Sequence, residues 1–238
     1  MSKTIRLGDI AIAVTHKDIK HVHLSVHPPT GRVTLVAPKA TRPEVARAYA
    51  VSKLGWIRNQ QARLRGQARE TPRQFVTRES HYVWGKRYLL AVVEREQKPS
   101  VTMDHRRITL SVRPGSDRAK RAAVMHAWHK GLLHEEVSRL IRKWEPRLEI
   151  EVAAYFLQRM KTKWGGCNHA AGHIRLNTEL VKKPKDLIEY VVVHEMAHLV
   201  APTHSERFVA LLGNHYPGWR EARAELNELP LASETWGR

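Results

Sequence analysis

The stretch VVVHEMAHLVAPTH, Val191–His204, places three histidines and one glutamate at fixed offsets in a mostly apolar run. Apolar residues here and just before it recur at helical spacing, which predicts a helix from Pro184 to about Val200. On such a helix His194 and His198 lie one turn apart on one face, so both imidazoles can reach one zinc ion at about 2.0–2.1 Å. The stretch therefore predicts a buried helix that carries two metal ligands.

The residues around these two histidines predict the rest of a catalytic zinc site. Glu195 is displaced around the helix from His194, where its carboxylate can hold a metal-bound water without binding the metal. Pro202 ends the helix, so the chain can turn back and bring His204 toward the ion as a third ligand. The offset from His198 to His204 is that of the metzincin pattern, although Ala201 stands where that pattern has glycine. We expect one zinc ion on the three histidines and Glu195 as general base.

Chance alone does not explain this pattern well, even in a chain with 15 histidines. The chain's own histidine and glutamate frequencies give roughly a 7% chance of one His-Glu-x-x-His, and a third histidine at position 204 lowers it below about 1%. The other histidines that could compete lack a second histidine or a base at the right spacing. Surface or packing roles are expected for His126, His129, His134, His169 and His173.

Size and composition indicate a soluble globular protein. With 238 residues, 42% of them hydrophobic, and seven tryptophans, the chain can bury a core as one large domain or two small ones. The first thirty residues hold no apolar run of signal-peptide length, and no later stretch reaches the length of a membrane helix. The single cysteine, Cys167, forbids an internal disulfide and agrees with a reducing compartment. We expect a cytoplasmic protein without a membrane partner.

The positive charge is concentrated in the N-terminal two-thirds of the chain. The formal net charge is +18, and residues 161–238 contribute 10 Lys and Arg against 9 Asp and Glu, which leaves +17 for residues 1–160. Such a region favours an anionic partner, whether nucleic acid, a nucleotide or an acidic protein, and is equally compatible with a solvated surface. No zinc finger, aromatic RNA-binding motif or helix-turn-helix accompanies the charge, so the sequence indicates no base-specific recognition.

Alternation and helical spacing predict an α+β architecture. Residues 19–38 alternate on both sides of PPTG, which predicts two strands and a turn, and residues 41–66 predict one long amphipathic helix. Further strands are expected over 81–94 and 100–112, and a helix from about 119 to 144 that Pro146 ends. The Pro- and Gly-containing segment 113–120 is the expected boundary between residues 1–115, a basic, strand-rich half with one long helix, and residues 116–238.

The C-terminal third is expected to hold a strand over 151–160, a loop over 161–172, a strand over 173–181, the helix of the metal site and a second helix over 205–215. A polar tail follows, and the sequence contains no evident internal repeat.

Several segments resemble the YgjP-like metallopeptidases, which are distant relatives of the SprT and WLM zinc proteins. The segments occur in that family's order and spacing: MKTKWGGCN (160–168), IRLNTELVKKP (174–184), LIEYVVVHEMAHLVAPTHSERFVALL (187–212) and YPGW (216–219). Weaker matches, GRVTLVAPKA, GWIRNQ and WGKRYLL, extend the resemblance over most of the chain. Lys163 stands where the family usually has arginine, and Gly166 where it usually has serine.

The resemblance implies a zincin-like metallopeptidase core in residues 116–238, with one zinc ion on His194, His198 and His204 and Glu195 as base. A peptide or protein is then the substrate. Lys161, Lys163 and Trp164 combine cationic donors with an aromatic platform and are candidates for substrate binding, although Trp164 equally suits a structural loop. Two alternatives stay open: a metal-dependent phosphohydrolase acting on nucleotides, and a nucleic-acid-associated protease.

Overall fold

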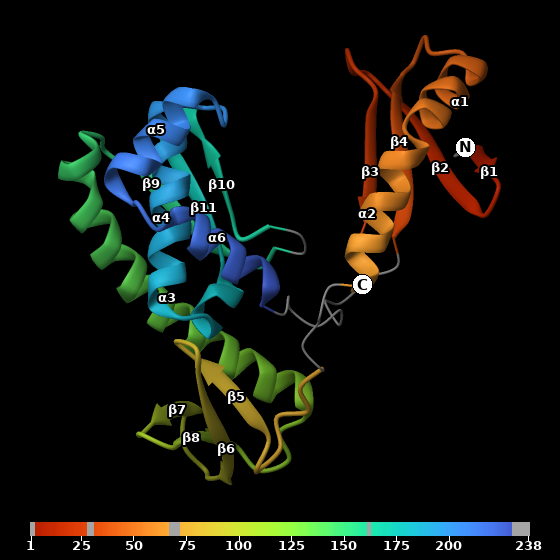
Figure 1. The fold of residues 1–238 in the computed structure, drawn as a ribbon. Helices are drawn as coiled ribbons and strands as arrows, with labels where there is room; N and C mark the ends of the chain where they lie inside the picture. The colour runs from red at the N-terminus through yellow and green to blue at the C-terminus, as the bar shows by residue number, and fades with distance from the viewer. Residues whose placement is uncertain (1–2, 28–30, 67–71, 161–162, 230–238) are drawn as a thin grey trace. The chain divides into compact units, whose positions relative to one another are not determined.

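The computed structural model describes residues 3–27, 31–66, 72–160 and 163–229 (Figure 1). In these residues the chain forms three small sheets and six α-helices, which confirms the predicted α+β class. The chain divides into two compact units, residues 1–69 and residues 70–235. The expected boundary at 115/116 therefore lies inside the second unit.

The first unit is a four-stranded sheet with helices on one face. Its central strands β2 and β4 are parallel, and each outer strand is antiparallel to its neighbour, in the order β1-β2-β4-β3. The elements are β1 (Lys3–Leu7), β2 (Ile10–Lys17), β3 (His23–His27), β4 (Arg32–Pro38), α1 (Pro43–Ser52) and α2 (Leu54–Gly66). Alternate strand residues face the helices and form the core: Ile10, Ile12, Val14, Val33, Leu35 and Ala37 pack with Ala46, Ala50 and Ile57.

The two strands predicted within residues 19–38 are confirmed as β3 and β4, but the single helix predicted over 41–66 is wrong. The helix breaks at Lys53, whose φ of −102° and ψ of 7° leave the helical range. Gly55 lies just beyond the break. Because glycine is a poor helix former, a continuous helix through this position is only weakly favoured. The break still lets Ile57 of α2 become fully buried in the same core as Ala50 of α1.

The second unit begins with the same topology. Its sheet has the order β5-β6-β8-β7, again with parallel central strands and antiparallel outer ones. The strands are β5 (Ser80–Val83), β6 (Lys86–Glu94), β7 (Ser100–Met103) and β8 (Arg107–Val112), followed by α3 (Arg118–Leu148). A two-residue hairpin with a glycine at positive φ joins the first two strands in both units, Gly8 at 62° and Gly85 at 77°. The chain thus contains a repeat of topology that is not evident in its sequence.

Helix α3 links this sheet to the larger core. Its N-terminal half packs Met125 and Trp128 against the sheet, and its C-terminal half buries Leu133, Leu140 and Trp144 among the C-terminal elements. Pro146 was expected to end the helix, but the helix runs on to Leu148 and ends at Glu149, which is left-handed at φ 54°. Pro146 and Arg142 are both exposed, so water can satisfy the carbonyl that the proline leaves without its helical donor.

The C-terminal elements form a three-stranded sheet covered by helices. The strand order is β10-β11-β9, with β11 antiparallel to β10 and parallel to β9. The elements are β9 (Ala154–Gln158), β10 (Gly165–Asn168), β11 (His173–Asn177), α4 (Lys185–Val200), α5 (Glu206–His215) and α6 (Trp219–Glu228), with 3₁₀ turns η1 (His169–Ala171) and η2 (Thr178–Lys182).

Three expectations for this region are corrected. Strand β10 lies in the segment expected to be a loop, because its pairing with β11 outweighs the weak strand preference of its two glycines. Residues 178–182 form a 3₁₀ turn rather than the end of a strand, since the Asn177 side chain accepts from Glu179 N and caps it. Helix α6 occupies the expected polar tail and buries Trp219, Ala222 and Leu226 at helical spacing. Residues 230–238 lie outside the described residues.

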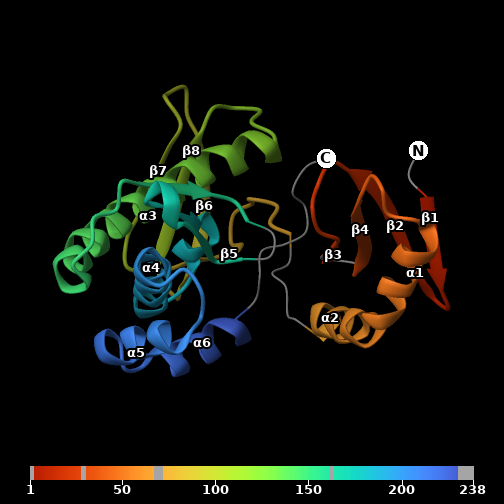
Figure 2. The ribbon, with the colours of Figure 1, turned by 90° about the horizontal axis from the view of Figure 1, so that it is seen from above.

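Helix α4 lies between α3 and the pair α5 and α6, with β10 and β11 also against it (Figures 1 and 2). It is buried along most of its length, which is typical of a helix inside a core. The Trp84–Gly85 hairpin turn anchors its start: Trp84 N donates to Val181 O at 2.8 Å, and a Cβ on Gly85 would lie 2.9 Å from Pro184 Cγ. Within the described ranges, no helix has the length and apolar character needed to cross a membrane.

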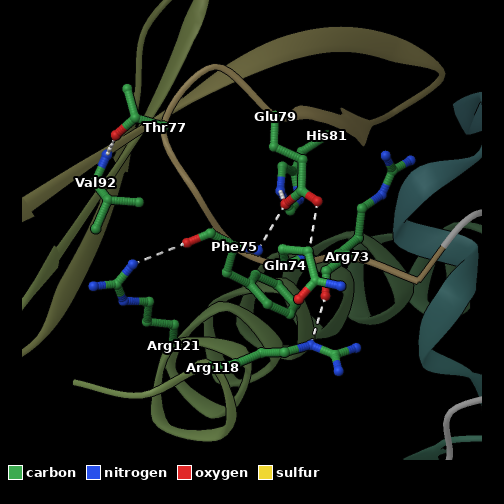
Figure 3. Close-up of polar contacts among 9 residues, drawn as sticks. All are labelled: Arg73, Gln74, Phe75, Thr77, Glu79, His81, Val92, Arg118 and Arg121. Carbon is green, nitrogen blue, oxygen red and sulfur yellow. Dashed lines mark hydrogen bonds and ion pairs between the residues drawn. The ribbon is translucent and has the colours of Figure 1, made fainter.

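The segment before β5 is held by one carboxylate, as Figure 3 shows. Glu79 accepts hydrogen bonds from Gln74 N at 2.7 Å and Phe75 N at 2.8 Å, and its Oε2 lies 3.0 Å from His81 Nε2. Partial burial raises the pKa of Glu79, but the two backbone donors and His81 outweigh it and leave the pKa below its usual value. Glu79 therefore stabilises this segment in its ionised form.

Replacing Glu79 by glutamine should destabilise the second unit. An amide offers one acceptor oxygen and turns an NH₂ group toward a backbone donor, so we expect a loss of about 2 kcal/mol, or about 5 °C in melting temperature. Because the folded pKa is lowered, the difference from the native protein should be full above about pH 4.5 and vanish as the pH falls through the folded pKa. Calorimetry at several pH values measures it. Exposed Glu96→Gln is the control, and equal melting of the Glu79→Gln and native proteins at pH 7 would contradict the role.

Candidate metal centre

Three histidines converge at the C-terminal end of α4. His194 and His198 lie one turn apart on this helix, and His204 lies in the link that joins it to α5. The helix ends at Val200 because Ala201 is extended, with φ −133° and ψ 95°, and Pro202 follows. One ligand atom from each histidine lies within 4.8 Å of the others, and no other group of three metal-binding side chains does so in the described part of the chain.

Contacts at Nδ1 orient two of these rings and leave their Nε2 atoms available to a metal. His198 Nδ1 lies 3.3 Å from Ala201 O, a carbonyl that can only accept, so Nδ1 carries the proton and Nε2 keeps a free lone pair. His194 Nδ1 lies 3.5 Å from Tyr190 Oη, and His194 Nε2 lies 3.2 Å from His204 Nε2. Two nitrogens bound to one tetrahedral zinc ion are about 3.3–3.4 Å apart. The spacing of these two rings fits such an ion.

One aromatic ring supports all three imidazoles. Phe208 of α5 is 2% exposed, and its ring stacks on His198 with centroids 4.5 Å apart. The same ring meets His194 and His204 edge-on, at 5.1 Å and 4.8 Å. The histidines are therefore held by packing as well as by hydrogen bonds, which restricts their rotamers before any ligand binds.

The protonation of the rings also fits metal binding. Burial, followed by the nearby His198 and His204, lowers the pKa of His194 to about 3, and burial lowers the pKa of His198. Imidazoles that are neutral at pH 7 keep the lone pair that a metal needs. Three imidazole nitrogens form a donor set that suits zinc among the common divalent metals, with a fourth position left for water or substrate.

Glu195 is the buried carboxyl beside this group. It is 6% exposed, and burial raises its pKa to about 8, although the positive charge of Lys163 opposes the shift. Its neighbour across the site is the backbone of β10, where a Cβ on residue 165 would lie 2.5 Å from Glu195 Oε1. Glycine at 165 is therefore required if the carboxyl is to lie where it does. A carboxyl with a pKa near neutrality can both accept and release a proton there.

A cavity of about 340 Å³ opens over the histidines and Glu195. Strand β10 forms one wall with Gly165, Gly166 and Cys167, and Lys163, His169 and Pro202 lie at its margins. Burial, aided by the charge of Glu195, raises the pKa of the Cys167 thiol to about 11, so it stays protonated at neutral pH. Its side chain thus lines the cavity in its neutral form.

The residues expected to bind substrate lie in different places. Lys163 lines this cavity, whereas Trp164 lines a neighbouring one and carries the Lys183 ammonium 5.3 Å from its ring centroid. Lys161 lies outside the described residues. His169, for which the sequence indicated only a surface or packing role, also lines the cavity.

Tyr190 and Phe208 were also missed as supports of the site, although a signal for each exists. Tyr190 precedes His194 by four residues, which is one turn of the same helix, and Phe208 follows His204 by four residues, in the first turn of α5.

Comparisons with known proteins give four findings. The family model described as "YgjP-like, metallopeptidase domain" matches residues 20–229. The crystal structure of the metallopeptidase zymogen abylysin of Pyrococcus abyssi is 22% identical, with a TM-score of 0.36, over 38% of this chain and 90% of abylysin. The zymogen jannalysin of Methanocaldococcus jannaschii is 21% identical, with a TM-score of 0.35, over 38% of this chain and 92% of jannalysin. No curated protein matches the chain.

The geometry predicts that the purified chain binds one equivalent of zinc and that His204→Ala loses most of it, because two imidazoles from one helix leave the ion half-coordinated. Elemental analysis after dialysis against a weak chelator measures the content. The control is His105→Ala, at an exposed position in the turn between β7 and β8. Stoichiometric zinc in the His204→Ala protein would remove His204 from the site.

Proposed function

Because the chain belongs to the YgjP-like metallopeptidase family, we propose that it hydrolyses peptide bonds with one zinc ion held by His194, His198 and His204. One observation carries the proposal: three imidazoles with ligand atoms within 4.8 Å of one another adjoin a buried carboxyl in a single cavity. The zincin-like arrangement of residues 116–238 and the role of the His-Glu-x-x-His helix are part of this proposal.

Each protein group has a distinct task in the proposed reaction. A zinc ion, when bound, supplies Lewis acidity that acidifies a water and polarises the peptide carbonyl. Glu195 would take a proton from the water that attacks the carbonyl, as general base, and would deliver it to the leaving amine when the C–N bond breaks. Tyr190 and Ala201 position the ligand rings through their Nδ1 atoms.

The substrate is proposed to lie along β10. This strand is at the edge of its sheet, so its outward backbone groups are available to pair with an extended peptide. Gly165 carries no side chain, which lets the strand backbone lie close to the carboxyl of Glu195. Lys163 precedes the strand, lines the cavity and is available as a cationic donor to a substrate carbonyl or carboxylate. A peptide held there would place one carbonyl over the histidine group.

Replacing Glu195 by glutamine should leave zinc content unchanged and lower peptide hydrolysis by at least about a thousandfold, because the amide cannot accept a proton. The measurement is cleavage of a fluorescently labelled casein by the zinc-loaded proteins, with nucleoside triphosphates tested in parallel. Turnover by the Glu195→Gln protein close to the native rate would remove Glu195 as base. Phosphate release from nucleotides without casein cleavage would contradict the peptidase proposal.

The pair Gly165→Ala and Gly166→Ala tests the position of the carboxyl. A methyl group at 165 would lie 2.5 Å from Glu195 Oε1 and must displace it, whereas a methyl group at 166 has open space within 4 Å. We expect Gly165→Ala to lose at least about tenfold in kcat with zinc retained, and Gly166→Ala to stay within about threefold of the native value. Equal effects of the two substitutions would show that contact with Glu195 is not what requires glycine at 165.

A further inference from the structure

A second cavity of about 220 Å³ adjoins the site on the side of α6. It shares Lys163, Gly165, His194 and Glu195 with the first cavity, so the two meet at the reacting groups. The remaining lining is mostly apolar, with two polar residues of α6: Trp164, Tyr190, Val191, Leu226, Arg223 and Asn227. Small-ligand sites usually exceed about 300 Å³, so a cavity of this size suits one side chain or chain end.

Helix α6 separates its charges between two faces. Its buried residues Trp219, Ala222 and Leu226 dock the helix onto the core. Glu221 and Glu225, four residues apart, line a different hollow, which also contains Asp186 and Glu189. Arg223 and Asn227, again four apart, line the cavity beside Glu195. The helix therefore directs its acidic side chains away from this cavity and a cation toward it.

No ion pair neutralises the cations at this cavity in the described structure, although Lys163 acts electrostatically on Glu195. Neither Arg223 nor Lys163 forms an ion pair with any described residue, although several other lysines and arginines of the second unit do. The only acidic residue in the lining is Glu195, which the proposed reaction uses as its proton carrier. The cavity thus combines a mostly apolar lining with Arg223, a cation that no ion pair neutralises, and this combination favours a carboxylate on a short apolar stem.

We propose that this cavity binds a carboxylate-bearing residue of the substrate next to the cleaved bond, with Arg223 as its ionic partner. The carboxylate belongs either to an aspartate or glutamate side chain or to the free C-terminus of a peptide. The inference rests on the proposed peptidase function, because it assigns the cavity to the substrate of that site. Arg223 is then a specificity-determining residue that binds substrate without taking part in proton transfer.

The test measures binding rather than cleavage. Zinc-loaded full-length protein carrying Glu195→Gln is titrated calorimetrically with the amides Ac-Ser-Ala-Ala-X-Ala-Ser-NH₂, where X is Glu, Gln or Lys. A fourth peptide, with X as Gln and a free C-terminal carboxylate, separates the two sources of the negative charge. We expect at least one of the two carboxylate peptides to bind about fivefold more tightly than the neutral amide.

Substitutions at Arg223 should then abolish or invert that preference. With Arg223→Gln the carboxylate and neutral peptides should bind within about twofold of each other, and with Arg223→Glu the Lys peptide should bind more tightly than the Glu peptide. Arg220→Gln removes the same charge from the same helix, at a guanidinium that stacks 4.4 Å over Trp219 and lines neither cavity, and should keep the fivefold preference.

Two results would overturn the proposal. One is equal binding of the carboxylate peptides and the neutral peptide by the parent protein. The other is a carboxylate preference that survives Arg223→Gln, which would assign the carboxylate to the metal or to Lys163. Failure of the peptidase function itself would appear elsewhere, as absence of casein cleavage by the native protein.

Discussion

The burial of α4 on nearly every side is the constraint on which the site depends. A helix enclosed by α3, α5, α6 and a sheet must satisfy every polar group it carries, because unpaired groups are costly away from water. His198 meets this demand through the carbonyl of Ala201, and His194 faces the hydroxyl of Tyr190. Glu195 keeps a raised pKa instead, because its burial disfavours the charged form. Packing thus sets the chemistry of each group.

Local patterns in the sequence predicted the helix and the link that carry the three histidines. The elements that the sequence did not predict form through contacts between distant segments. The three histidines His194, His198 and His204 lie on one helix and one short link, so their spacing in the sequence was enough to predict that they meet. Strand β10 could not, because its two glycines form a strand only through pairing with β11. Helix α6 was mistaken for a tail, since only three apolar residues in ten mark its buried face. The sequence did not predict the contacts of Arg223 and Trp164. Each contact depends on how segments that are distant in the sequence pack together.

The repeated topology of the two units leaves no evident repeat in the sequence. The two copies share a pattern of burial: Val33, Leu35 and Ala37 in β4 correspond in role to Ile108, Leu110 and Val112 in β8. Many apolar sequences satisfy such a pattern, so the residue identities can diverge while strand order and direction persist. The two copies differ mainly in the helices that come after them. After β4 come two short helices, and after β8 comes a single helix that extends well past its sheet.

That extension has a consequence for how the second unit melts. At 31 residues, α3 is about 46 Å long. Its N-terminal half covers the β5–β8 sheet, and its C-terminal half packs in the core around α4. Complete unwinding of the helix would uncover apolar side chains of both the sheet and the core, so α3 couples the unfolding of the two. A ligand that binds the histidines therefore also stabilises strands that do not contact the ligand. Amide hydrogen exchange in β8 would slow as the occupancy of the site rises.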